Sequence, residues 1–262
     1  MSRHSLSTAA ATLIVLSLAS LAARAETLSQ TLDGKTLAVD LACVDRVEIQ
    51  PKAGLAGKVV VEATSNRDGE LKDFVFKGGA TASVTRERRS CTSTGLEQPK
   101  TTVSIQVPAG MPIDIKNGGS TNYVVGAVGA SLHARLAGSG YLTAVSATDL
   151  DILVSGSSSV NVGQTSGPAA VQIAGSGDFR IGNTDMPSLK IDVRGSGRFT
   201  IDNGRIGTLA ASVAGSGALK IMATVQDATL STVGSGDIEV AKVTGSLSSS
   251  KAGSGTIRAG RS

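Results

Sequence analysis

A short tripeptide, Gly-Ser-Gly, recurs through the C-terminal half of the chain at nearly constant spacing. It or a close variant begins at seven positions separated by 18 to 20 residues, and a degenerate copy, Gly-Ser-Thr, begins 19 residues earlier at Gly119. A period of this length is typical of repeat proteins in which each unit packs mainly against its neighbours. The first glycines of the seven copies are Gly138, Gly156, Gly175, Gly195, Gly215, Gly234 and Gly253.

The residues around each tripeptide alternate between apolar and polar types. With the first glycine as position zero, positions −6, −4, −2, +4 and +6 hold 32 apolar residues out of 35, whereas positions −5, −3, −1, +3 and +5 hold only 10 out of 35. A period of two indicates strands with one buried face. Two short strands enclose no core, but stacked copies do, with about 4.8 Å between coils.

The pattern therefore predicts an all-β protein, a single-stranded parallel β-helix or β-solenoid of about 19 residues per coil. We expect it to be right-handed, because parallel crossover connections strongly prefer that hand. The very low aromatic content, 2%, fits a thin core filled by aliphatic side chains.

The glycines of the tripeptide are expected to be structural corners of the coil. The alternation places both glycines inward and the serine outward, so a Cβ at either glycine would crowd the interior or need a disfavoured φ. Segments between copies, such as Gly182–Ser188 and Asp202–Thr208, are rich in turn residues. We expect turns there, on the side where binding is most favoured. The predicted corner glycines are Gly138, Gly140, Gly156, Gly175, Gly177, Gly195, Gly197, Gly215, Gly217, Gly234, Gly236, Gly253 and Gly255.

The chain divides into three parts. Residues 1–25 have a basic start, an apolar run and Ala23-Arg24-Ala25, which is typical of a signal peptidase site. Residues 26–110 alternate without the tripeptide and are expected to form an irregular β N-terminal part or cap, and residues 111–262 form the repeat solenoid. No segment after residue 25 is long and apolar enough to span a membrane. These features predict export to the periplasm, the cell surface or the medium of a Gram-negative bacterium.

Export places the two cysteines, Cys43 and Cys91, in an oxidising compartment. We expect a disulfide between them, and two buried free thiols remain the alternative.

Removing residues 1–25 leaves 23 basic and 21 acidic residues, a net charge of +2. A charge this small without a basic patch argues against nucleic-acid binding. The one basic cluster, Arg86–Arg89, is interrupted by Glu87 and is interpreted as a solvated strand edge.

Candidate catalytic and ligand-binding motifs are few. The single histidine after residue 25, His133, lies in an outward column, and a serine repeated in every coil indicates a corner rather than a nucleophile. No nucleotide-binding motif follows the glycines. Gly-Ser-Gly-Asp at 175–178 and 234–237 is similar to calcium-binding β-rolls, but the aspartate occurs in only two copies and the period differs. We therefore predict no catalytic residue, no cofactor and no metal, and interpret the outward +5 column as a solvated face.

Three segments resemble a known family. These are Val103–Gly110, Gly-Ser-Gly-Asp-Phe-Arg-Ile at 175–181 and Gly-Ser-Gly-Asp-Ile-Glu-Val at 234–240. Together they resemble the putative auto-transporter adhesin, head GIN domain family, over about residues 36–260. The resemblance implies an exported β-helical domain with no catalytic residues to carry over.

The sequence thus favours a non-catalytic, exported β-solenoid that acts as an adhesin-like or envelope interaction and display protein. Its partner would be an envelope or surface protein or a glycan. The alternatives are a structural or assembly element of the cell envelope and, less favoured, an enzyme that acts on polysaccharide.

Overall fold

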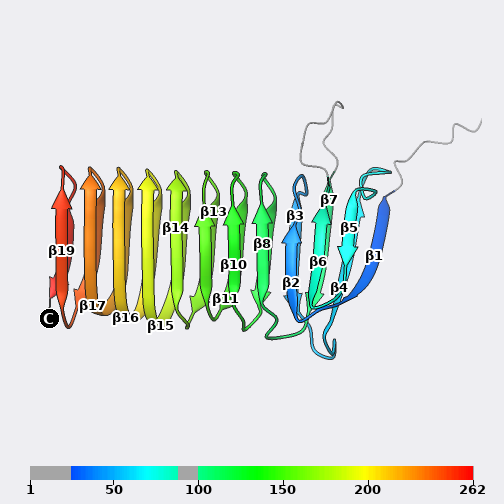
Figure 1. Cartoon of the computed structure of the whole chain (residues 1–262), viewed down its shortest axis with the longest axis horizontal. Coiled ribbons are helices and arrows are strands. Elements are labelled where there is room, and N and C mark those ends of the chain that lie inside the picture. Colours follow the sequence, from blue (N-terminus) through cyan, green and yellow to red (C-terminus); the bar gives the residue numbers. More distant parts are fainter. Residues whose placement is uncertain (1–24, 88–99, 262) are drawn as a thin grey trace, which may run out of the picture.

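The computed structural model describes residues 25–87 and 100–261, which form a β-solenoid without helix in those ranges. Parallel strands about 19 residues apart stack into about eight turns, and the rod runs from the N-terminal strands at one end to the last repeat at the other (Figure 1). The predicted fold class is confirmed. Residues 1–24 lie outside the described ranges, so the signal peptide stays a prediction.

The repeat region consists of two arms per coil, each paired with the same arm of the next coil. Strands β8, β10, β12 and β14 pair in parallel along one side, and β9, β11, β13 and β15 along the other. In each of β15, β16 and β17, the arm that follows one tripeptide and the arm that precedes the next form a single long strand. The strands are β8 (Ile113–Asn117), β9 (Asn122–Ala127), β10 (Leu132–Leu136), β11 (Tyr141–Ala147), β12 (Leu150–Val154), β13 (Ser159–Thr165), β14 (Ala169–Gly175), β15 (Asp178–Gly195), β16 (Arg198–Gly215), β17 (Ala218–Gly234), β18 (Asp237–Val243), β19 (Leu247–Ala252) and β20 (Ile257–Arg261).

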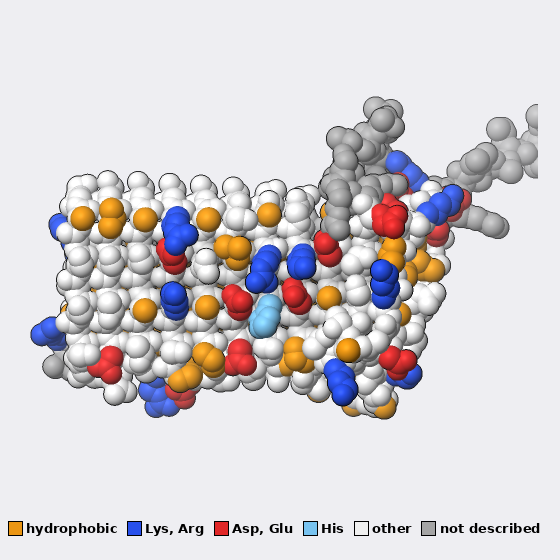
Figure 2. Space-filling model, viewed as in Figure 1, with side chains coloured by type: hydrophobic (Ala, Val, Ile, Leu, Met, Phe, Trp, Pro, Cys, Tyr) orange, Lys and Arg blue, Asp and Glu red, His pale blue; other side chains and the backbone are white. Residues whose placement is uncertain are grey.

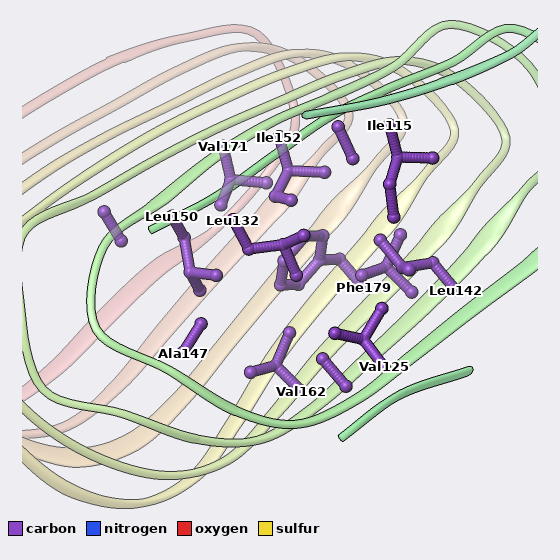
Figure 3. Close-up of a cluster of buried hydrophobic side chains, with 14 of the residues drawn as sticks. Ile115, Val125, Leu132, Leu142, Ala147, Leu150, Ile152, Val162, Val171 and Phe179 are labelled. Carbon is purple, nitrogen blue, oxygen red and sulfur yellow. The ribbon is translucent and has the colours of Figure 1, made fainter. Parts of the chain in front are cut away.

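The predicted apolar columns are continuous ladders in the core. Equivalent positions pair directly, as with Phe179 and Phe199, whose rings stack with centroids 5.3 Å apart. All 30 inward positions of the first six repeats are buried, and Figure 3 shows such side chains from several coils meeting inside the coil. In the last repeat Ser249 and Lys251, at inward positions, are exposed because no further coil covers them.

The turns predicted between repeats are wrong for two segments. Gly182–Ser188 and Asp202–Thr208 lie within the long strands β15 and β16. An additional inward ladder explains the extended backbone: buried apolar side chains there stack from coil to coil and their strands pair in parallel. Met186, Ile206 and Val225 lie nine residues before the next tripeptide and Val243 lies ten before it, outside the compared columns from −6 to +6, so the column comparison missed the ladder. Its members are Met186, Ile206, Val225 and Val243.

The N-terminal strands continue the same core and then close its end. Strands β2 and β3 pair in parallel with β8 and β9, and β6 and β7 pair in parallel with β2 and β3. Strands β4, β1 and β5 then add antiparallel neighbours, which lie at the end of the rod in Figure 1. Their bounds are β1 (Glu26–Asp33), β2 (Thr36–Asp40), β3 (Arg46–Pro51), β4 (Lys58–Ser65), β5 (Phe74–Lys77), β6 (Thr81–Arg86) and β7 (Thr101–Val107).

Arg86 is a buried ionic anchor of this end, not part of a solvated edge as the sequence suggested. Its side chain is 1% exposed, with Nη2 3.0 Å from Glu70 Oε2 and Nε 3.1 Å from Asp73 Oδ1. Nη1 donates to the carbonyl of Cys43, and the guanidinium lies 5.3 Å from the centre of the Phe74 ring. The side chain thereby ties β6 to two separate loops. The rest of the cluster is largely outside the described residues.

The two glycines of the tripeptide meet different neighbours. At Gly215 φ is +124°, and a Cβ would lie 2.6 Å from the carbonyl oxygen of Gly195 in the preceding coil. This first glycine thus faces neighbouring backbone rather than the core. At Gly197, which is buried, a Cβ would lie 2.5 Å from Ile173 Cγ2 in the interior. The close stacking of coils therefore constrains the first position. The second is constrained both by core side chains and by stacked backbone, since a Cβ at Gly197 would also lie 2.8 Å from the carbonyl oxygen of Gly177.

One copy replaces the second glycine with serine. Ser158 is fully buried, and its hydroxyl oxygen has no hydrogen-bond partner among the described residues. A buried hydroxyl without a partner costs free energy of folding. This coil is therefore less favourably packed at its corner than its neighbours.

Candidate functional site

The outward columns form the surface on which a ligand could bind. Among the described residues, no cluster of three or more histidine, cysteine, aspartate or glutamate side chains is arranged to hold a metal ion. Nor does any described segment form a helix of the length and hydropathy needed to cross a bilayer. The corner serines are exposed, as in the pair Ser235 and Ser254, whose hydroxyl oxygens lie 3.1 Å apart. Cys91 lies outside the described ranges, so its pairing with Cys43 stays a prediction.

A groove of about 300 Å³ crosses four successive coils on the face of β11, β13, β15 and β16. We call it the Tyr141 groove. It follows the outward +3 and +5 columns, whose residues pair coil to coil in strict register. The surface side chains that line it are Tyr141, Thr143, Ser159, Asn161, Asp178, Arg180, Arg198 and Thr200.

The hollow results from a change in side-chain size along the +3 column. Tyr141, 61% exposed, stands at one end, and Ser159 follows it in the next coil. Asp178 and Arg198 then rise at the other end. Because the ladder fixes each backbone position, a small residue between larger ones leaves an open depression over the buried core residue Val160.

Two solvent-exposed ion pairs lie at the charged end of the groove. Arg180 Nη2 lies 2.7 Å from Asp202 Oδ2, and the hydrogen bond between the two side chains raises the pKa of the arginine. Arg198 Nη1 lies 3.3 Å from Asp178 Oδ1. Each guanidinium therefore has a carboxylate neighbour that compensates its charge while leaving further N–H donors toward solvent.

The middle of the groove carries polar side chains that make no hydrogen bond to the described residues. The amide of Asn161 and the hydroxyls of Thr143 and Ser159 make no side-chain hydrogen bond within the described residues. Thr143 and Asn161 face outward from neighbouring strands about 4.8 Å apart, and Ser159 lies on the same strand as Asn161, so the three groups supply donors and acceptors close together. The sequence interpretation of the +5 column as a solvated face missed this groove. The available signal was an outward tyrosine beside a serine in the same column.

A second groove, of about 510 Å³, lies on another face of the solenoid and includes His133. The exposed imidazole is on β10, in register with Asp114 on β8 and Asp151 on β12. Figure 2 shows the histidine among acidic and basic side chains on this face. The serine that lines this groove, Ser188, is three coils away, about 14 Å along the axis. Ser188 is therefore not placed beside His133.

Comparison with known proteins places the chain in a family. No curated protein matches it. Two solved structures described as adhesins, both marked putative, have the same fold: one from Parabacteroides merdae ATCC 43184 and one from Parabacteroides distasonis ATCC 8503. The first has a TM-score of 0.67 at 15% identity, covering 90% of this chain and 96% of that one. The second has a TM-score of 0.64 at 17% identity, covering 91% and 98%.

A third structure, described as a putative lipid binding protein from Parabacteroides distasonis ATCC 8503, has a TM-score of 0.55 at 16% identity. It covers 90% of this chain and 96% of that one. At such identities the likeness shows the fold alone. The model of the family "Putative auto-transporter adhesin, head GIN domain" matches residues 40–222 and 170–260. The two matches together span most of the sequence, so the chain belongs to the putative auto-transporter adhesin, head GIN domain family.

Proposed function

We propose that this chain is an exported, non-catalytic, adhesin-like protein that binds a component of a cell envelope through an outward face of its solenoid. The observation that carries the proposal is the Tyr141 groove, in which an exposed aromatic ring and unused polar groups lie side by side on four coils. Exposed aromatic residues are enriched where proteins bind partners. Membership of an adhesin-named family supports the same function.

The architecture suits binding because the face is rigid. Every outward side chain of the groove is flanked along its strand by buried ladder residues, such as Leu142 and Phe179, that fix the backbone. A preorganised surface loses little conformational entropy when it binds. The outward positions can also vary without disturbing the core. A solenoid of this kind therefore supplies a stable frame on which a ligand-specific face is built.

The assembly alternative is less well supported by the described structure. Strands β19 and β20 at the last coil expose their outer edge, where another chain could pair. However, the inward column of that coil ends in the exposed Lys251, and a stacked copy would bury its charge. Inward-pointing charges at sheet edges oppose such pairing. An enzymatic role has less support, because Ser188, the serine that lines the His133 groove, lies three coils from the histidine.

The proposal is tested by measuring the binding of fluorescently labelled residues 26–262 to envelope fractions and to intact bacterial cells. We expect saturable binding that unlabelled protein displaces. Ser159→Arg, which fills the groove, should weaken binding, whereas Ser216→Arg, at an exposed corner outside it, should not. Absence of saturable binding to every surface would refute the proposed function. Equal binding by both variants would place the binding face elsewhere.

A further inference from the structure

We propose that the Tyr141 groove is a saccharide-binding site, which accepts a short oligosaccharide lying along the solenoid axis. The inference rests on the proposed function and names its ligand class. Three features of the groove carry it: the exposed ring at one end, the spacing of the coils and the type of polar group presented by each coil.

The exposed ring provides a stacking platform. Tyr141 is 61% exposed, whereas the other tyrosine, Tyr123, is buried, and no phenylalanine among the described residues is strongly exposed. A tyrosine ring exposed in this way offers a ligand an apolar face and a polar hydroxyl together. The C–H groups on one face of a pyranose ring pack well against an aromatic ring. The remaining hydroxyls of that sugar point outward, toward polar neighbours.

The spacing of the groove matches a chain of sugars. Equivalent positions in the four coils from Tyr141 to Arg198 are separated by about 4.8 Å, or about 14 Å in total. This step is close to the length of one pyranose unit in an extended glycan. A sugar stacked on Tyr141 would therefore place its next neighbour over Ser159 and Asn161. The following sugar would reach Asp178 and Arg180.

The polar groups are of the types that recognise vicinal hydroxyls. The Asn161 amide, the Asp178 carboxylate and the Arg180 guanidinium are planar groups with two or more hydrogen-bonding positions each. Their chemistry also argues against a nucleic acid, whose affinity depends on phosphate contacts by uncompensated cations. In this groove Arg180 and Arg198 are each paired with a carboxylate. A neutral or weakly charged saccharide satisfies these groups better than a polyanion does.

The chain contains its own reporter for this proposal. It has no tryptophan and only two tyrosines, so tyrosine fluorescence comes from buried Tyr123 and exposed Tyr141. Residues 26–262 are first screened on an array of di- to tetrasaccharides of hexoses and N-acetylhexosamines, and the strongest binder is titrated in solution. We expect a saturable change in tyrosine fluorescence. The change should be absent in Tyr141→Phe, which lacks the exposed phenol fluorophore but keeps a ring for stacking.

Affinity measured by calorimetry separates stacking from unrelated effects. Tyr141→Ala should weaken binding about tenfold or more, whereas Tyr141→Phe should stay within about threefold of the unmodified protein. Met222→Ala is the matched control, since Met222 is exposed on β17 but does not line the groove. It should bind like the unmodified protein. Equal affinity of Tyr141→Ala and the unmodified protein would overturn the inference.

Failure of this inference can be told apart from failure of the proposed function. If no oligosaccharide binds but labelled protein still binds envelope fractions saturably, the ligand is not a saccharide and the binding function stands. If protease treatment of those fractions abolishes binding and periodate oxidation leaves it unchanged, the partner is a protein and the saccharide assignment is wrong. If periodate oxidation of the fractions abolishes binding and Tyr141→Ala does the same, both proposals are supported.

Discussion

Replacing Gly215 by alanine is expected to lower the free energy of unfolding by about 2 to 6 kcal/mol. The glycine has φ of +124°, and a conformation of this kind costs a residue with a Cβ about 1 to 3 kcal/mol. The added Cβ would also lie 2.6 Å from the carbonyl oxygen of Gly195, which adds overpacking of about 1 to 3 kcal/mol. The adjacent Ser216 is exposed, and Ser216→Ala should change stability by less than about 0.5 kcal/mol.

Urea unfolding followed by circular dichroism measures both variants. Because each coil contacts mainly its neighbours, a defect in the middle of the stack can also split unfolding into two transitions. Gly253→Ala, with an even closer contact of 2.3 Å to the Gly234 carbonyl oxygen, lies in the last coil, where fewer contacts are lost if the coil detaches. Its effect on global unfolding should be smaller. If Gly215→Ala unfolds like the unmodified protein, close backbone stacking does not explain the repeated first glycine.

Other perturbations test particular contacts. Arg86→Met should destabilise the chain by about 3 to 5 kcal/mol in chemical denaturation, because it leaves two carboxylates without their buried cation; a loss below about 1 kcal/mol would show that the anchor is dispensable. Ser158→Ala should stabilise by about 1 to 3 kcal/mol in the same assay, since it removes a buried hydroxyl without a partner, and a loss of stability would reveal an unrecognised hydrogen bond. Burial raises the pKa of Tyr123, so its stabilising contribution is complete below about pH 10 and is lost as the pH rises further. In urea titrations at alkaline pH, the free energy of unfolding of Tyr123→Phe should therefore fall less steeply with pH than that of the unmodified protein. An identical decline would contradict this origin. Reduction should cost about 4 kcal/mol if Cys43 and Cys91 are bonded, and a Cys43→Ser variant should then melt alike with and without reductant.

The ladders were predictable because the same burial constraint acts on every coil. Burial on one face of a strand enforces a period of two, and identical coils turn that period into columns that can be compared across seven copies. The inward ladder through Met186 and Ile206 stacks in the same way, but it lies nine residues before the next tripeptide, at an odd offset outside the compared columns, and was therefore missed. Interpreting Gly182–Ser188 as a turn followed its composition, whereas pairing with neighbours on both sides holds it extended.

Features that occur once could not be derived in this way. Arg86 looks like a surface arginine in sequence, because its two carboxylate partners lie in the loop between β4 and β5, whose approach only the tertiary structure fixes. The Tyr141 groove depends on the size of Ser159 relative to its neighbours one coil away, which is a property of the surface rather than of the fold. Outward columns carry no periodic constraint, so the sequence supports the frame strongly and the binding face weakly.

Because each coil pairs in strict register with the next, the number of coils can change without altering how the remaining coils pack. Excising Gly215–Val233 would join Ala214 to Gly234, and each remaining column would keep its phase. The product would be shorter by one coil, about 4.8 Å, with the Tyr141 groove unchanged. Gain or loss of whole repeats therefore adjusts the distance between the groove and the far end of the molecule in fixed steps. A protein built in this way can change its reach without changing what it recognises.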